Sequence, residues 1–157
     1  MMKHRNSTLA TAAFSMTLCC AAHASDAPAD PCSLLAPADL STVFRQSYDA
    51  AQKSVAPRPF ANTVQGTDCT YKQSKGSGQL LFRIYFDPSP AAAADLFARL
   101  GGFFQPQTPM AGVGDKAYID GQGGAHILKG NVRFFLQGGH SSPNQLTALA
   151  QQIAGRL

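Results

Sequence analysis

Residues 79–87, Gln-Leu-Leu-Phe-Arg-Ile-Tyr-Phe-Asp, form the most regular stretch of this 157-residue chain. Successive side chains of a β-strand point to opposite faces of the sheet. One face of this stretch would carry the apolar side chains of Leu80, Phe82, Ile84 and Phe86. The other face would carry Leu81, Arg83 and Tyr85. The alternation predicts a strand that buries one apolar face.

Turn signals on either side of this strand predict its neighbours. Residues 75–78, Lys-Gly-Ser-Gly, favour a hairpin turn that leads back to a short strand at 69–73. Glycine-rich turns later in the chain separate three further short strands, predicted near 115–120, 125–129 and 131–137.

Helix-start signals indicate three helices. A proline at the first helical position opens a predicted helix at 37–53. A serine cap at Ser89 opens the second helix, which Gly101 closes, and a capping box at Ser142 opens the last one. The predicted order is α-β-β-α-β-β-β-α. This order is typical of an α+β fold in which an antiparallel sheet of about five strands has helices packed mainly on one face.

The first 24 residues have the features of a cleaved secretory signal peptide. Lys3 and Arg5 precede an apolar run at 9–22 that is too short to anchor the chain in a membrane. Residues 22–24, Ala-His-Ala, then supply a cleavage site. Cleavage would leave residues 25–157 as a single α+β domain that is exported to the periplasm or secreted.

The cysteines agree with export. Cys19 and Cys20 would leave with the signal peptide, and neither follows the lipobox pattern of a lipoprotein, so no membrane anchor is expected after cleavage. Cys32 and Cys69 remain as a pair in an oxidising compartment, where a disulfide is expected. Closing that loop would stabilise the fold by about 4 kcal/mol in the chain-entropy model. A reactive or metal-binding thiol pair is the alternative, but no third cysteine or nearby histidine supports it.

The charge of the chain is weak evidence about partners. Loss of Lys3 and Arg5 lowers the formal net charge from +4 to +2. The remaining excess is small and scattered along the sequence, so no nucleic-acid partner is predicted.

Three stretches carry a family pattern. They are residues 31–40, Pro-Cys-Ser-Leu-Leu-Ala-Pro-Ala-Asp-Leu, residues 69–71, Cys-Thr-Tyr, and residues 112–118, Gly-Val-Gly-Asp-Lys-Ala-Tyr. In order and spacing they resemble a group of small bacterial exported proteins, many of them lipoproteins, whose function is uncharacterised. This chain departs from the pattern at Ala36 and Asp39, where the family has threonine and glutamate, and it lacks the lipobox. The resemblance implies one domain and the same disulfide, and it implies no activity.

The candidate binding surface is the face of the strands opposite the apolar stripe. It combines arginine with aromatic side chains, which are enriched at protein interfaces. Its predicted members are Arg83, Tyr85, Arg133 and Phe135, with Lys72 as a neighbour and with His126 if that side chain points the same way. A histidine there would titrate near neutral pH. The alternative is a covered face, in which the arginine stems lie against aromatic rings and need no partner.

Catalytic and metal-binding motifs are weak. Gly112 and Gly114 lack the third glycine and the following helix of a dinucleotide fingerprint, so a tight turn into a strand is predicted. His126 and His140 are the only histidines after cleavage, and with Lys129 they could form an acid–base pair of the ribonuclease kind. Two histidines alone are too few for a typical metal site. We therefore predict no catalytic residue, metal or cofactor.

These observations favour a non-enzymatic binding module. Its expected partner is another envelope or extracellular protein, as for an inhibitor, an immunity factor or an envelope-complex subunit. The alternative is a carrier that holds a small apolar ligand between the layers of the fold. A histidine-dependent hydrolase is the third hypothesis. The sequence predicts no oligomeric state.

Overall fold

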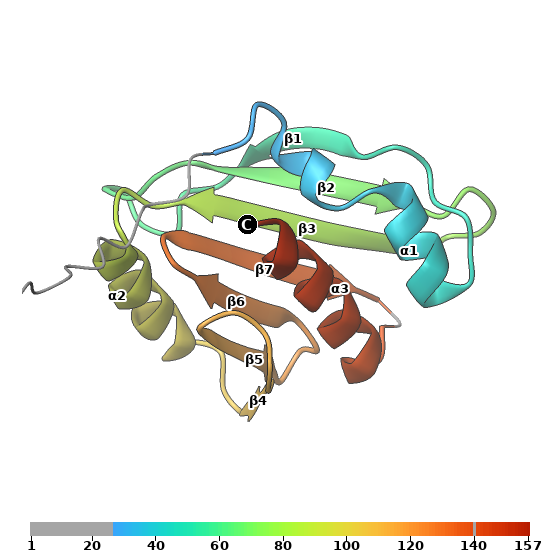
Figure 1. The fold of residues 1–157 in the computed structure, drawn as a ribbon. Helices are drawn as coiled ribbons and strands as arrows, with labels where there is room; N and C mark the ends of the chain where they lie inside the picture. Colours follow the sequence, from blue (N-terminus) through green and yellow to red (C-terminus); the bar gives the residue numbers. More distant parts are fainter. Residues whose placement is uncertain (1–26, 140) are drawn as a thin grey trace, which may run out of the picture.

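The computed structural model describes residues 27–139 and 141–157, and it shows an α+β fold built on a single antiparallel sheet (Figure 1). The predicted signal peptide at 1–24 and the side chain of His140 lie outside the described residues.

The sheet has seven strands rather than about five. They are β1 (Gln52–Ala56), β2 (Gly66–Lys72), β3 (Gln79–Phe86), β4 (Gln107–Pro109), β5 (Lys116–Asp120), β6 (Ala125–Lys129) and β7 (Val132–Gly138). Their spatial order is β1-β2-β3-β7-β6-β5-β4. Two meanders, β1 to β3 and β4 to β7, are therefore joined through the antiparallel pair of β3 and β7.

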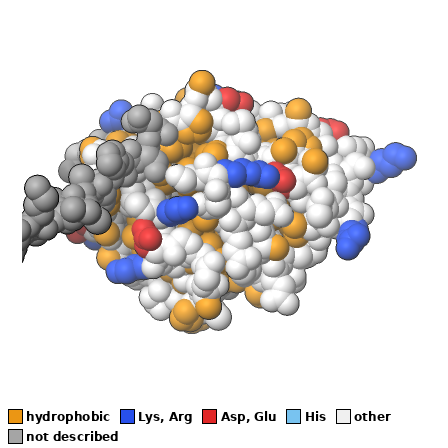
Figure 2. Space-filling view, viewed as in Figure 1, with side chains coloured by type: hydrophobic (Ala, Val, Ile, Leu, Met, Phe, Trp, Pro, Cys, Tyr) orange, Lys and Arg blue, Asp and Glu red, His pale blue; other side chains and the backbone are white. Residues whose placement is uncertain are grey.

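One face of the sheet carries the main core. The 3₁₀ helix η1 (Pro31–Leu34) and the helices α1 (Pro37–Phe44) and α3 (Pro143–Arg156) belong to this face, and α1 and α3 lie in front of the sheet in Figure 1. Phe82 of β3, Ile127 of β6 and Leu149 of α3 are fully buried between the layers. The predicted apolar stripe of β3 is confirmed by the burial of Leu80, Phe82 and Ile84. Figure 2 shows that Lys, Arg and Asp side chains on this side of the molecule are interspersed rather than gathered by sign.

The remaining helix, α2 (Pro90–Gly101), packs on the opposite face of the sheet. Its Ala93 and Phe97 form a second small core with Tyr118 of β5 and Leu128 of β6. The expectation that the helices cover mainly one face thus holds for α1 and α3 but is wrong for α2. The apolar side chains of α2 cover only part of this face of the sheet. The rest of the face is open and forms the site described below.

The first helix is shorter than predicted. It ends at Phe44 rather than near residue 53, because Arg45 adopts the left-handed conformation (φ 60°, ψ 31°) and donates its N–H to the Ser41 carbonyl. Residues 52–56 instead form β1, which pairs with β2. Four of the five β1 residues are exposed, so this strand lacks the alternation by which strands are predicted. The element order therefore differs from the predicted one.

The predicted disulfide between Cys32 and Cys69 is confirmed, and it ties η1 to β2. The hydroxyl of Tyr71, two residues further along β2, lies within hydrogen-bonding distance of the carbonyl oxygens of Cys32 and Leu35, which share its one proton. Burial raises the pKa of Tyr71, which keeps this donor protonated. The stretches at 31–40 and 69–71 therefore hold the first described helices on the sheet.

The third stretch forms the predicted tight turn into β5. Gly112 and Gly114 both have positive φ (71° and 56°), and a Cβ on Gly114 would lie 2.4 Å from the Leu128 carbonyl oxygen. The Asp115 N–H donates to that same oxygen at 2.8 Å. Glycine is required here by close packing of the turn against β6.

Across the described ranges, no helix is both long enough and apolar enough to cross a bilayer.

Candidate functional site

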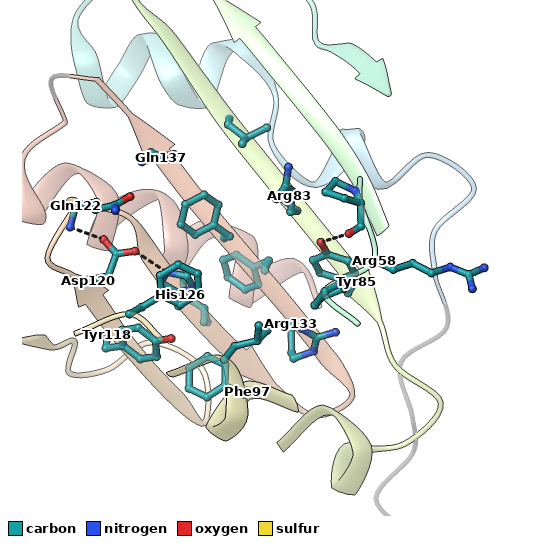
Figure 3. Close-up of a pocket in the computed structure, with 18 residues that line it drawn as sticks. Arg58, Arg83, Tyr85, Phe97, Tyr118, Asp120, Gln122, His126, Arg133 and Gln137 are labelled. Atoms are coloured by element: carbon teal, nitrogen blue, oxygen red, sulfur yellow. Dashed lines mark hydrogen bonds and ion pairs between the residues drawn. The ribbon is translucent and has the colours of Figure 1, made fainter. Parts of the chain in front are cut away.

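A cavity of about 410 Å³ lies on the sheet face that α2 only partly covers (Figure 3). Its floor comes from β3 and β7, whose register places Arg83 opposite Phe135 and Tyr85 opposite Arg133. Its walls come from α2, from β5 and β6, and from residues 57–59 after β1. Strand alternation directs this set of side chains away from the main core.

Aromatic rings cluster where the wall formed by β5 and β6 meets β7 on the floor of the cavity. The His126 ring lies parallel to the Tyr118 ring, with centroids 4.8 Å apart and an interplanar angle of 17°. Phe104 and Phe135 contact the same imidazole, each with a centroid distance of 4.7 Å. Phe97 of α2 then meets Tyr118 edge-on at 5.3 Å. These contacts are within the range that stabilises aromatic pairs, so the wall is a packed cluster of rings.

Gly124 allows this wall to close. It precedes β6, and a Cβ at this position would lie 2.4 Å from an atom of the Phe135 ring. The absence of a side chain lets Phe135 lie beside His126.

Asp120 holds the imidazole in place. Its Oδ2 lies 2.8 Å from His126 Nε2, and its Oδ1 accepts the backbone N–H groups of Gln122 and Gly124. Burial opposes ionisation of Asp120, but these hydrogen bonds outweigh burial and lower its pKa. Burial lowers the pKa of His126 despite the opposing effect of Asp120. The pair is thus a carboxylate and a neutral imidazole at neutral pH, with Nε2 carrying the proton that Asp120 accepts.

Arg133 lies at the base of the cavity and is almost completely buried. Its Nε and Nη2 donate to the two carboxylate oxygens of Asp87 at 2.5 and 3.1 Å. The side chains of Arg133 and Asp87 are 4% and 0% exposed, so the charges are compensated inside the protein. The guanidinium also lies over the Tyr85 ring, 4.7 Å from its centroid.

Arg83 is paired in the same way nearer the surface. Its Nε and Nη2 donate to Asp68 of β2 at 2.6 and 2.8 Å, and this pairing raises the pKa of Arg83. Tyr85 donates its hydroxyl to the Pro57 carbonyl at 2.8 Å, which fastens the segment after β1 to the cavity rim. The neighbouring Arg58 is exposed, and its side chain extends away from the other labelled residues in Figure 3.

Five of the six predicted binding residues line this one cavity: Arg83, Tyr85, Arg133, Phe135 and His126. The sixth, Lys72, is exposed at the far end of β2 opposite Gln79 and is not among the lining residues. The predicted binding surface did not include four further lining residues, Phe97, Phe104, Tyr118 and Asp120. The alternation within β5 could have indicated Tyr118 and Asp120, whereas Phe104 lies in a loop that shows no pattern.

His126 and Lys129, which the acid–base hypothesis would combine, lie on opposite faces of the sheet. The Lys129 ammonium donates to the Ala154 carbonyl of α3, on the main-core face, whereas His126 faces the cavity. Among the described residues, no three His, Cys, Asp or Glu side chains are grouped as metal ligands would be.

No protein family, curated protein or solved structure matches this chain.

Proposed function

We propose that this protein is a binding protein for a small molecule with a flat, apolar body, held in the cavity on the partly covered face of the sheet. The observation that carries the proposal is the cluster of rings in which Phe104, Tyr118 and Phe135 all contact His126, along one side of a space of about 410 Å³. Small-molecule sites are typically concave, of several hundred Å³, and lined by apolar and aromatic side chains with a few fixed polar groups.

The rigidity of the walls supports the proposal. Arg133 is held by Asp87, Arg83 by Asp68 and His126 by Asp120, so few side chains would need to be ordered on binding. Preformed sites bind more tightly because this ordering cost is already met in the free protein.

The same ion pairs favour a small molecule over the protein partner that the sequence suggested. An arginine contributes most to a protein interface when its guanidinium can reach the partner. Here Arg133 and Arg83 each give Nε and Nη2 to an internal carboxylate. A protein partner stays a prediction, and so does the absence of enzymatic activity.

An extracellular or periplasmic location fits the disulfide between Cys32 and Cys69. We propose that the ligand is met there, after removal of residues 1–24.

Binding of 2-naphthol, a flat and largely apolar fluorescent probe, tests the proposal on the oxidised mature protein. The blocking variant is Leu100→Trp, because Leu100 lines the cavity from α2. The matched control is Phe103→Trp, which places the same indole three residues further on, where the side chain is 74% exposed. We expect saturable binding by the wild type and the control, and at least about tenfold weaker binding by the blocking variant.

Two results would overturn the proposal. The first is no saturable binding of the probe by the wild type. The second is equal binding by Leu100→Trp when its far-UV circular dichroism and melting temperature match those of the control.

A further inference from the structure

A second hollow, of about 750 Å³, lies beside the cavity at the ends of β3 and β7. Its described lining contains no Asp, Glu, Lys, Arg or His side chain. It contains six glutamines instead: Gln46, Gln73, Gln79, Gln122, Gln137 and Gln145. We refer to this hollow as the glutamine cleft.

Only two of these six side-chain amides make hydrogen bonds to the described protein. Gln73 accepts the Gly78 N–H at 3.3 Å, and Gln145 accepts the Ser142 N–H at 2.9 Å in the capping box of α3. The side-chain amides of the other four glutamines make no hydrogen bond to the described protein. Each amide offers one acceptor oxygen and two N–H donors, so the cleft presents donors and acceptors together without a charge.

The cavity and the glutamine cleft adjoin. Leu81, Gln122 and Gln137 line both of them, and Leu81 and Gln137 are directly opposite one another in the β3–β7 register. Figure 3 shows Gln122 and Gln137 on the β5–β7 side of the cavity, away from Arg58. A molecule with its body among the aromatic rings would therefore meet amides where it leaves the cavity on this side.

We propose that the ligand is amphipathic, with its flat apolar body in the cavity and an uncharged, multiply hydroxylated part, such as a sugar, in the glutamine cleft. This inference rests on the proposed function of the cavity. A hydroxyl group is both donor and acceptor, as an amide is, so neighbouring hydroxyls can exchange hydrogen bonds with the glutamines.

The charges of the site support an uncharged ligand. Among the described residues that line the cleft, a charged ligand would meet no side chain of opposite charge. In the adjoining cavity, the guanidinium groups of Arg83 and Arg133 are already paired with Asp68 and Asp87.

The position of the cleft disfavours an extended peptide. Peptides that bind by strand addition need a free sheet edge. The cleft lies at the ends of β3 and β7, and both strands are hydrogen-bonded to neighbours on either side, β3 between β2 and β7, and β7 between β3 and β6.

Matched naphthalene probes separate the two parts of the inference. The probes are 2-naphthol, its β-glucoside, its β-galactoside, its β-N-acetylglucosaminide, and its β-glucuronide, which carries a carboxylate. We expect at least one neutral glycoside to bind about tenfold more tightly than 2-naphthol, since two net hydrogen bonds are worth roughly that factor. The glucuronide should bind no more tightly than 2-naphthol.

Variants test where the sugar lies. Gln46→Ala with Gln79→Ala removes two amides that line the cleft but not the cavity. Gln52→Ala with Gln151→Ala is the control, because these two exposed glutamines line neither hollow. The first double variant should lose most of the glycoside's gain and keep its affinity for 2-naphthol, whereas the control should keep both.

The outcomes distinguish the two proposals. If 2-naphthol binds and every neutral glycoside binds no more tightly, the inference is wrong while the proposed function stands. If the gain survives Gln46→Ala with Gln79→Ala, the sugar does not occupy the cleft and the inference is again wrong. If 2-naphthol shows no saturable binding, the proposed function and the inference that rests on it are both overturned.

Discussion

Replacement of Arg133 by methionine removes the cation at the base of the cavity and keeps a side chain of similar length. Arg133 and Asp87 are 4% and 0% exposed and are joined by two hydrogen bonds of 2.5 and 3.1 Å. In Arg133→Met the Asp87 carboxylate would remain buried without its counter-ion. The Tyr85 ring would also lose its cation, which lies 4.7 Å from the ring centroid.

The magnitude follows from this burial. Breaking a buried ion pair by removing one partner costs about 3–5 kcal/mol. The pair of Arg83 and Asp68 provides an internal comparison, because its side chains are 27% and 12% exposed. Arg83→Met should cost less, about 1.5–3 kcal/mol, since water can reach the carboxylate that is left behind.

A double variant separates the charge from the packing. Arg133→Met with Asp87→Leu removes both charges, and replacing a buried ion pair by apolar residues is often nearly neutral. We therefore expect the double variant to be more stable than Arg133→Met alone. It should remain less stable than the wild type, because the contact with Tyr85 is still lost.

The assay is urea unfolding of the oxidised protein, followed by far-UV circular dichroism because the chain has no tryptophan. The free energy of unfolding is compared at constant m-value, so that a change in midpoint reports stability. The reasoning is refuted if Arg133→Met costs no more than Arg83→Met, or if adding Asp87→Leu lowers stability further.

Three further predictions concern single positions and use the same unfolding assay. Burial lowers the pKa of His126 below its ordinary 6.5. As the pH falls below about 6.5, the unfolded chain therefore binds a proton at this histidine before the native protein does, and the free energy of unfolding decreases. His126→Gln should lose less stability than the wild type between pH 7.5 and 5.5, and an equal loss would contradict this. Gly114→Ala should cost more than the 1–2 kcal/mol typical of the left-handed conformation, because the new Cβ would also lie 2.4 Å from the Leu128 carbonyl oxygen. Gly130→Ala has the same φ of 56° and nothing within 4 Å of the new Cβ, so a cost as large as that of Gly114→Ala would count against the packing argument. Ser142→Ala removes the cap of α3 and should cost about 1 kcal/mol, and an unchanged midpoint would show that the cap contributes nothing.

Short sequence patterns predicted the starts of two helices, the buried face of β3 and the disulfide. Ser89 and Ser142 accept backbone N–H groups at the starts of α2 and α3, as their cap patterns indicated. The alternation of β3 predicted which residues enter the main core, and the pair of Cys32 and Cys69 predicted the disulfide.

Elements without such signals were missed. The first helix ends at Phe44, because the next residue, Arg45, has a left-handed conformation that arginine rarely adopts. β1 is mostly exposed, and β4 has three residues and ends in Pro109. Both lie at the edges of the sheet, where pairing with β2 or β5 decides that a strand forms.

The sequence by itself determined the two faces of the sheet, because strand periodicity assigns each side chain to a face. It therefore indicated that Arg83, Tyr85, Arg133 and Phe135 belong together. Only the tertiary structure decided that this face is hollow. The pairing of Arg133 with Asp87 spans 46 residues, and the aromatic wall needs Phe104 from a loop beside His126 from β6. Contacts between segments that are distant in sequence depend on how the two meanders and α2 pack. Local sequence patterns therefore do not predict them.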